Sequence, residues 1–206
     1  MQTLKPVKTT FLEAISALID KIEKNIEGYP FDIKMTLVGG AAIHMYCGSR
    51  YTEDVDAFFS KKILFPEDVS VYYKKDDGNT GMLYLDKQYN PNFGLLHEDA
   101  EDDALYCQEV NSEERKIKLY VLSPVDLAVS KISRYGTQDV EDIEELARHG
   151  LIDADSLNAR ANDALLDYVG NHQVIKHSIE LITEKVRAIE VAKKTKSVTW
   201  GVSLKR

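Results

Sequence analysis

Residues 33–40 read Ile-Lys-Met-Thr-Leu-Val-Gly-Gly, and residues 50–59 read Arg-Tyr-Thr-Glu-Asp-Val-Asp-Ala-Phe-Phe. The first stretch is apolar at most positions and then meets two glycines, which predicts a buried strand followed by a tight turn. Residues 41–46 can then form a short helix. Together they predict a strand, a turn and a helix around which the rest of the chain is organised.

The second stretch predicts another strand, in which Asp54 and Asp56 share one face while Val55 points to the core. Two carboxylates beside a glycine turn that opens a helix suit a phosphate bound together with a metal ion. The glycines let backbone amides approach closely, and the N-terminus of a helix favours an anion. Carboxylate oxygens are ligands for Mg²⁺, which usually also binds substrate phosphate oxygens. The two aspartates would repel each other unless a cation joined them.

The Gly-Gly turn, with Arg50 and Thr52 just before Asp54-Val55-Asp56, resembles the nucleotidyltransferase superfamily that includes DNA polymerase beta. Two branches are most similar, the tRNA nucleotidyltransferases and a group of small bacterial proteins related to AbiEii-like toxins. The chain lacks room for the large helical body of a housekeeping tRNA nucleotidyltransferase. A second stretch favours the toxin branch, because it is similar to the helix-borne Lys, Arg and Asp-x-x-Asp pattern of those proteins: residues 122–128, then Lys131, Arg134, Asp139 and Asp142.

This resemblance implies an enzyme that moves a nucleoside monophosphate from a nucleoside triphosphate to a hydroxyl acceptor. It implies that Asp54 and Asp56 hold Mg²⁺ or Mn²⁺, and that Lys131 projects toward the same cleft to balance the triphosphate. The residues that it implies for nucleotide binding are Gly39, Gly40, Arg50, Thr52, Arg134, Asp139 and Asp142. Lys131 and Arg134 lie three apart and so share a helix face; a merely exposed, charged face is the alternative interpretation.

Transfer of this kind usually needs a third carboxylate, which lowers the pKa of the attacking hydroxyl and shares a metal. The candidates, in order of preference, are Asp86 at the end of an apolar strand, then Glu98 and Asp99, then Asp139 and Asp142. Because the third acid is not evident, one alternative is a non-catalytic nucleotide-binding or antitoxin-like protein. Another alternative is transfer onto a protein side chain. The expected partners are a nucleoside triphosphate, tRNA or another RNA, and a cognate antitoxin in a toxin–antitoxin or phage-defence setting.

The bulk composition narrows the class of protein. With 206 residues, 44% of them apolar, the chain can form one domain or a compact core with a helical appendage. A net charge of −8 argues against binding nucleic acid by bulk charge. Cys47 and Cys107 form no disulfide or metal pattern, and no apolar run approaches the roughly 20 residues that span a bilayer. We therefore expect a cytoplasmic protein with no membrane partner.

The order of elements predicts an α+β fold, with a mixed β-sheet nucleotidyltransferase core followed by a C-terminal helical bundle. A helix should begin after Thr9 or Thr10, and two strands should flank the turn at 76–79. Residues 105–110 and 116–122 should form a hairpin at the sheet edge. The expected helices then cover 124–135, 138–149, 155–168 and 172–192, and the expected domains are 1–123, a cleft-closing helical region at 124–194, and a basic tail at 195–206 that contains Trp200.

The five histidines show no metal-ligand spacing. His44 belongs to the short helix beside the two glycines, and we interpret it as a packed or surface histidine.

Overall fold

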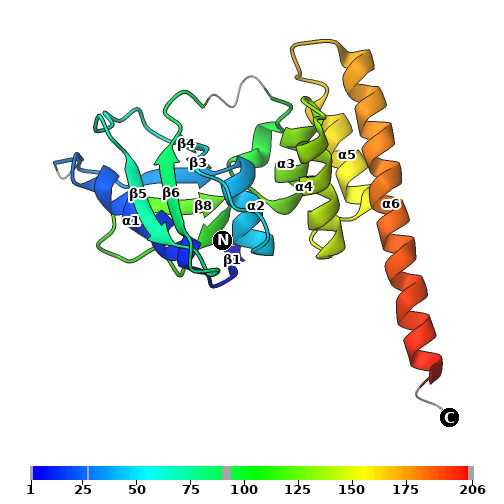
Figure 1. Ribbon diagram of the computed structural model, residues 1–206. Helices are drawn as coiled ribbons and strands as arrows, with labels where there is room; N and C mark the ends of the chain where they lie inside the picture. The colour runs from blue at the N-terminus through cyan, green and yellow to red at the C-terminus, as the bar shows by residue number, and fades with distance from the viewer. Residues whose placement is uncertain (1, 27, 90–93, 204–206) are drawn as a thin grey trace. The chain divides into compact units, whose positions relative to one another are not determined.

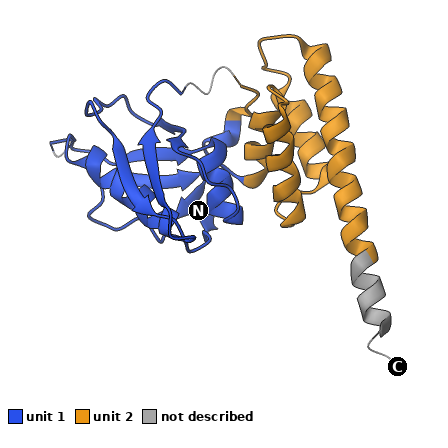
Figure 2. Ribbon diagram, in the orientation of Figure 1, with its two compact units in different colours: residues 1–91, 99–123 blue, residues 92–98, 124–206 orange. Residues whose placement is uncertain are grey.

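The computed structural model describes residues 2–26, 28–89 and 94–203, with side chains as far as residue 195 (Figure 1). It confirms the expected α+β fold. The chain divides into two compact units, residues 1–91 with 99–123 and residues 92–98 with 124–206 (Figure 2). No described helix has the length and apolar character needed to cross a membrane.

The first unit is built on a mixed five-stranded sheet. Its strands, in spatial order, are β1 (Thr3–Leu4), β7 (Leu105–Cys107), β8 (Ile117–Val121), β2 (Ile33–Leu37) and β4 (Ala57–Phe59). β2 is parallel to β8 and antiparallel to β4. The expected hairpin exists as the antiparallel pair β7–β8, but its position at the sheet edge was wrong. β8 lies in the middle of the sheet because its second edge pairs with β2.

A three-stranded sheet completes the first unit, in the order β3 (Asp54–Val55), β6 (Thr80–Leu85) and β5 (Ser70–Lys74). β5 and β6 are antiparallel and are joined by the predicted turn, in which Gly78 has φ 85°. Helix α1 (Thr10–Glu23) packs on this sheet and buries Phe11 and the rest of its apolar stripe. Thr9 is its N-cap residue, but the Thr9 side chain makes no capping hydrogen bond.

The strand segment 54–59 joins the two sheets. Its first half pairs with β6, where Asp54 lies opposite Tyr84, and its second half pairs with β2, where Ala57 lies opposite Leu37. Val55 and Ala57 are buried, whereas Asp54 and Asp56 are half-buried. The expected alternation is therefore present, and it places both carboxylates on one face at the junction of the sheets.

The second unit is helical. Its helices are α3 (Pro124–Ile132), α4 (Thr137–Arg148), α5 (Ala154–Ala164) and α6 (His172–Ser203). α3 ends three residues earlier than expected, before Tyr135, which has a left-handed backbone with φ 47°. α5 also ends early, while α6 continues through most of the expected basic tail. The side chain of Trp200 lies outside the described residues.

Candidate nucleotide-binding site

Helix α2 (Gly39–Cys47) begins at the first glycine, directly after β2 and Val38. The expected helix at 41–46 is present and begins two residues earlier, and Gly39, with φ 60°, makes the expected tight turn where the strand meets the helix. Val38 is the N-cap residue, and its side chain cannot accept a hydrogen bond from the first amides. The start of α2 thus presents backbone N–H groups and a partial positive charge, which favour an anion.

The carboxylate of Asp56 lies against this helix start. A Cβ atom added to Gly39 would lie 2.2 Å from Asp56 Oδ2, and Gly39 has φ 60°, so glycine is required there for both space and backbone conformation. The Val38 amide donates to the Asp56 carbonyl at 3.0 Å, which fixes the two segments together. Because Asp56 already places negative charge here, a phosphate would need a cation to bind beside it.

The second glycine contacts the loop that carries Arg50 and Thr52. A Cβ atom added to Gly40 would lie 2.8 Å from Arg50 Nε and 3.2 Å from Thr52 Cβ. The Thr52 hydroxyl donates to the Asp54 carboxylate and to the Asp54 carbonyl. Arg50 therefore brings positive charge to the helix start, and Thr52 orients Asp54. The structure brings together these predicted site residues of the first unit: Gly39, Gly40, Arg50, Thr52, Asp54 and Asp56.

Asp86 follows the end of β6. Its amide donates to the Val55 carbonyl at 3.0 Å, so the Asp86 backbone continues the β3–β6 ladder beside Asp56. Its Oδ1 atom accepts a hydrogen bond from the Gln88 amide at 2.8 Å. Among the described residues, no three His, Cys, Asp or Glu side chains are grouped so that they could hold a metal ion. Asp86 as the third acid stays a prediction.

The next candidates, Glu98 and Asp99, lie on a 3₁₀ turn, Glu98–Ala100.

The helical candidates form a charged network inside the second unit. Lys131 Nζ lies 2.7 Å from Asp142 Oδ2 and 3.8 Å from Asp139 Oδ1. Arg134 Nη2 lies 2.8 Å from Asp139 Oδ1, and Gln138 Nε2 donates to Asp142 Oδ1 at 3.3 Å. The sequence pattern therefore identified residues that meet in space.

The two cations of the network both reach Asp139 Oδ1, as a shared face predicts, but they differ in exposure. Lys131 is buried, 2% exposed, whereas Arg134 follows the end of α3 and its side chain is 68% exposed. An exposed helix face was thus the wrong alternative for Lys131. Its positive charge is compensated by Asp142 within the unit, and its contact with a triphosphate stays a prediction.

His44 is a residue whose part in this site the sequence did not reveal. It is fully buried in α2, its Nδ1 atom lies 2.7 Å from the Arg50 carbonyl oxygen, and its Nε2 atom lies 3.0 Å from Thr9 Oγ1. Of the two interpretations, packed or surface, the structure shows the packed one, and the spacing from Arg50 gave no signal of the hydrogen bond. Burial is the main cause that lowers the pKa of His44 below its usual range.

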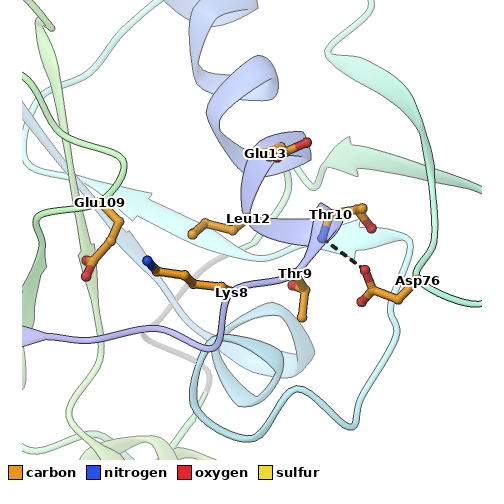
Figure 3. Close-up of a pocket in the computed structure, with 7 residues that line it drawn as sticks. All are labelled: Lys8, Thr9, Thr10, Leu12, Glu13, Asp76 and Glu109. Carbon is orange, nitrogen blue, oxygen red and sulfur yellow. Dashed lines mark hydrogen bonds between the residues drawn. The ribbon is translucent and has the colours of Figure 1, made fainter.

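A pocket of about 470 Å³ lies at the start of α1, and its lining holds none of Gly39, Gly40, Asp54 and Asp56 (Figure 3). Glu13, Asp76 and Glu109 contribute three carboxylates, against one cation from Lys8. The Thr10 amide donates to Asp76 at 3.3 Å. This excess of negative charge makes the pocket a poor site for a triphosphate.

A family model described as "Nucleotidyltransferase of unknown function (DUF6036)" matches residues 13–187. The chain belongs to this family. The matched range includes the glycine turn, the aspartate strand and the charged network of the second unit, so the family extends over both units. No curated protein matches the chain. The expected membership of a nucleotidyltransferase family is thus confirmed at this level, while the closer relation to AbiEii-like toxins stays a prediction.

Proposed function

We propose that this member of the nucleotidyltransferase family transfers a nucleoside monophosphate from a nucleoside triphosphate to a hydroxyl acceptor, in a reaction that needs Mg²⁺ or Mn²⁺. The observation that supports this most is the arrangement around α2. Asp56 lies against Gly39, Arg50 and Thr52 lie against Gly40, and Asp54 shares the face of Asp56. Anion-binding amides, a guanidinium and two carboxylates thus meet at one helix start.

The donor set fits a divalent cation. Asp54 and Asp56 are half-buried on one face and offer hard oxygen atoms, which are the ligands that Mg²⁺ prefers. When bound, such an ion would supply charge stabilisation to the phosphates during transfer. Thr52 keeps the Asp54 carboxylate in place through its hydroxyl.

The residues of the chain then have separate tasks. The first amides of α2 bind phosphate oxygens, and Arg50 offsets their negative charge. The acceptor oxygen attacks the α-phosphorus, a new P–O bond forms, the bond to the bridging oxygen of the β-phosphate breaks, and pyrophosphate leaves. A carboxylate takes the acceptor proton, and we propose Asp86 for this step because its backbone lies beside Asp56.

For the acceptor we propose tRNA, in a cytoplasmic toxin–antitoxin or phage-defence setting with a cognate antitoxin. The support is the resemblance of the helical Lys, Arg and Asp-x-x-Asp pattern to small toxin-type nucleotidyltransferases, together with the family membership. A protein side chain as acceptor is the competing outcome of the experiment below.

A second candidate function is nucleotide binding without transfer. It is favoured by one observation: the Asp86 carboxylate accepts the Gln88 amide hydrogen bond, as in a simple local turn. In that case Asp54 and Asp56 would still bind a metal–nucleotide complex, and the protein would act as a sensor or an antitoxin-like partner.

The test is incubation of the purified chain with each α-³²P-labelled nucleoside triphosphate, total tRNA and cell lysate, with Mg²⁺, with Mn²⁺ or with EDTA. We expect metal-dependent label on RNA, and loss of both label and nucleotide binding in Asp54→Asn/Asp56→Asn. Asp32→Asn is the matched control, because Asp32 is an exposed carboxylate before β2, at the other end of that strand from Gly39.

Asp86→Asn separates the two candidate functions. Loss of label with unchanged nucleotide affinity supports Asp86 as the base, since a group that acts in the transition state contributes little to substrate binding. Label on protein alone would show that a protein side chain, and not tRNA, is the acceptor. Metal-dependent nucleotide binding without any label would favour the sensor, and absence of nucleotide binding would refute both.

A further inference from the structure

His44 connects the start of α1 to the loop that carries Arg50. Its imidazole is fully buried and stacks on Phe11, with ring centroids 4.2 Å apart. One ring nitrogen contacts the Arg50 carbonyl and the other contacts the Thr9 hydroxyl. The ring of Tyr51 lies 5.1 Å away on centroids. Both polar atoms of the ring are therefore satisfied inside the core.

The partners define the protonation state of the ring. A carbonyl oxygen can only accept, so Nδ1 carries the hydrogen and donates to Arg50. Nε2 of the neutral ring then accepts from the Thr9 hydroxyl. Burial disfavours the charged form, in agreement with the lowered pKa of His44. The neutral Nδ1–H tautomer is thus the form that holds the Arg50 peptide.

The hydrogen bond to Arg50 matters because the loop after α2, which carries Arg50 and Thr52, returns to the start of the same helix. α2 ends at Cys47, and its C-cap residue Gly48 has a left-handed backbone with φ 69°, which turns the chain out of the helix. Two residues later, the Arg50 side chain lies back against Gly40, and Thr52 lies beside it. One rigid helix therefore presents the glycine amides at its start and, through His44, holds the loop that returns to that start.

We propose that His44 is a positioning residue for nucleotide binding, which holds the Arg50 carbonyl so that the Arg50 guanidinium stays beside Gly40. This inference rests on the proposed function of the same site. His44 itself touches no phosphate in this scheme, and its effect passes through Arg50. Thr9 acts one step further away, because its hydroxyl donates to Nε2 of the His44 ring, and the ring in turn holds the Arg50 carbonyl.

A role in packing alone makes a different prediction. An apolar side chain could fill the same space, and a buried imidazole costs free energy unless both nitrogens are hydrogen-bonded. If packing were its only task, replacement of His44 would lower stability but leave the affinity for nucleotide in the folded fraction unchanged. The two roles therefore separate in a measurement of affinity.

The test is a double-mutant cycle on the affinity for a fluorescent Mg²⁺–nucleoside triphosphate, with His44→Met, Arg50→Ala and the double variant. We expect each single variant to weaken binding by about tenfold, the size typical of one lost interaction with a charged group. The double variant should bind no more weakly than Arg50→Ala alone, since His44 acts through Arg50. Losses that multiply, or unchanged affinity in His44→Met, would overturn the proposal.

Two further variants keep the test decisive if His44→Met does not fold. His44→Asn retains an N–H donor close to the Nδ1 position, and we expect it to recover part of the lost affinity. Thr9→Val removes only the outer hydrogen bond, and we expect a smaller loss together with faster amide hydrogen exchange at 49–53. If neither variant differs from the wild type in affinity or exchange, the proposal is wrong.

The matched control is His97→Met, because His97 is another buried histidine, 7% exposed, bonded to Asp163 in the second unit. It should leave nucleotide affinity unchanged. Nucleotide binding that is lost on replacement of Asp54 and Asp56 but is unchanged on replacement of His44 would overturn this inference alone. Wild-type protein that binds no nucleotide would overturn the inference together with the proposed function.

Discussion

Gly39→Ala perturbs the candidate site at its tightest contact. The new Cβ atom would lie 2.2 Å from Asp56 Oδ2 and 3.1 Å from Asp56 Cγ. Ordinary van der Waals contact begins near 3.4 Å, so the carboxylate has to move by about 1 Å. The backbone is also strained, because Gly39 has φ 60°, a conformation that glycine adopts far more readily than alanine.

The structure allows the two effects to be separated. The left-handed backbone costs about 1–2 kcal/mol at a residue with a Cβ atom, or about 2–8 °C in melting temperature for a chain of this size. A displacement of about 1 Å disrupts the interactions of a charged group, each worth about 1.5–3 kcal/mol, or roughly 10- to 100-fold in affinity. We therefore expect Gly39→Ala to lose about 10- to 100-fold in affinity for Mg²⁺–nucleoside triphosphate while its melting temperature falls only moderately.

Gly78→Ala is the matched control. Gly78 has φ 85° in the turn between β5 and β6, and an added Cβ atom there has no atom within 4 Å. It should show a similar loss of melting temperature and unchanged nucleotide affinity. The assays are thermal unfolding by circular dichroism and titration with a fluorescent nucleotide. Equal affinity in Gly39→Ala and Gly78→Ala would refute the assignment of the phosphate site to the start of α2.

Three further predictions concern buried ionisable groups. Lys131→Met should lower the free energy of unfolding in urea by about 3–5 kcal/mol, because it leaves Asp142 buried without its cation. Arg134→Ala, at an exposed position, should lower it by less than about 1 kcal/mol. Equal losses in the two variants would contradict the charged network. Burial raises the pKa of Cys107 to about 11, so it should resist alkylation at pH 8 until the protein unfolds, and rapid labelling of the native chain would show that it is accessible. The pKa of His44 is lowered in the folded state, so as pH drops below 6.5 the unfolded chain takes up a proton at His44 more readily than the folded chain, and the free energy of unfolding should fall. His44→Asn should reduce this dependence of stability on pH. An unchanged dependence would exclude His44 as its source.

The sequence predicted the elements of the site because its signals are local. The apolar run before Gly39, the alternation around Val55 and the turn at Gly78 all record burial or backbone conformation within a few residues. The same holds for Lys131 and Asp142, which are eleven positions apart in sequence and meet across one helix connection. Short-range periodicity carries this information directly.

Other features depended on which distant segments pair, and local patterns do not record that. β8 reads as an edge strand by sequence, yet β2, more than 80 residues away, takes its second edge. A lysine beside other charged residues reads as part of an exposed face by sequence, yet Lys131 is buried by the packing of its helix. His44 contacts Thr9, 35 residues before it, and the Thr9 hydroxyl that could have capped α1 goes to the imidazole instead. The sequence by itself determined the strand–glycine–helix unit and the aspartate strand, whereas the tertiary structure alone decided how Arg50 is held beside that unit, because a side-chain hydrogen bond depends on the close approach of segments whose distance is set only by folding.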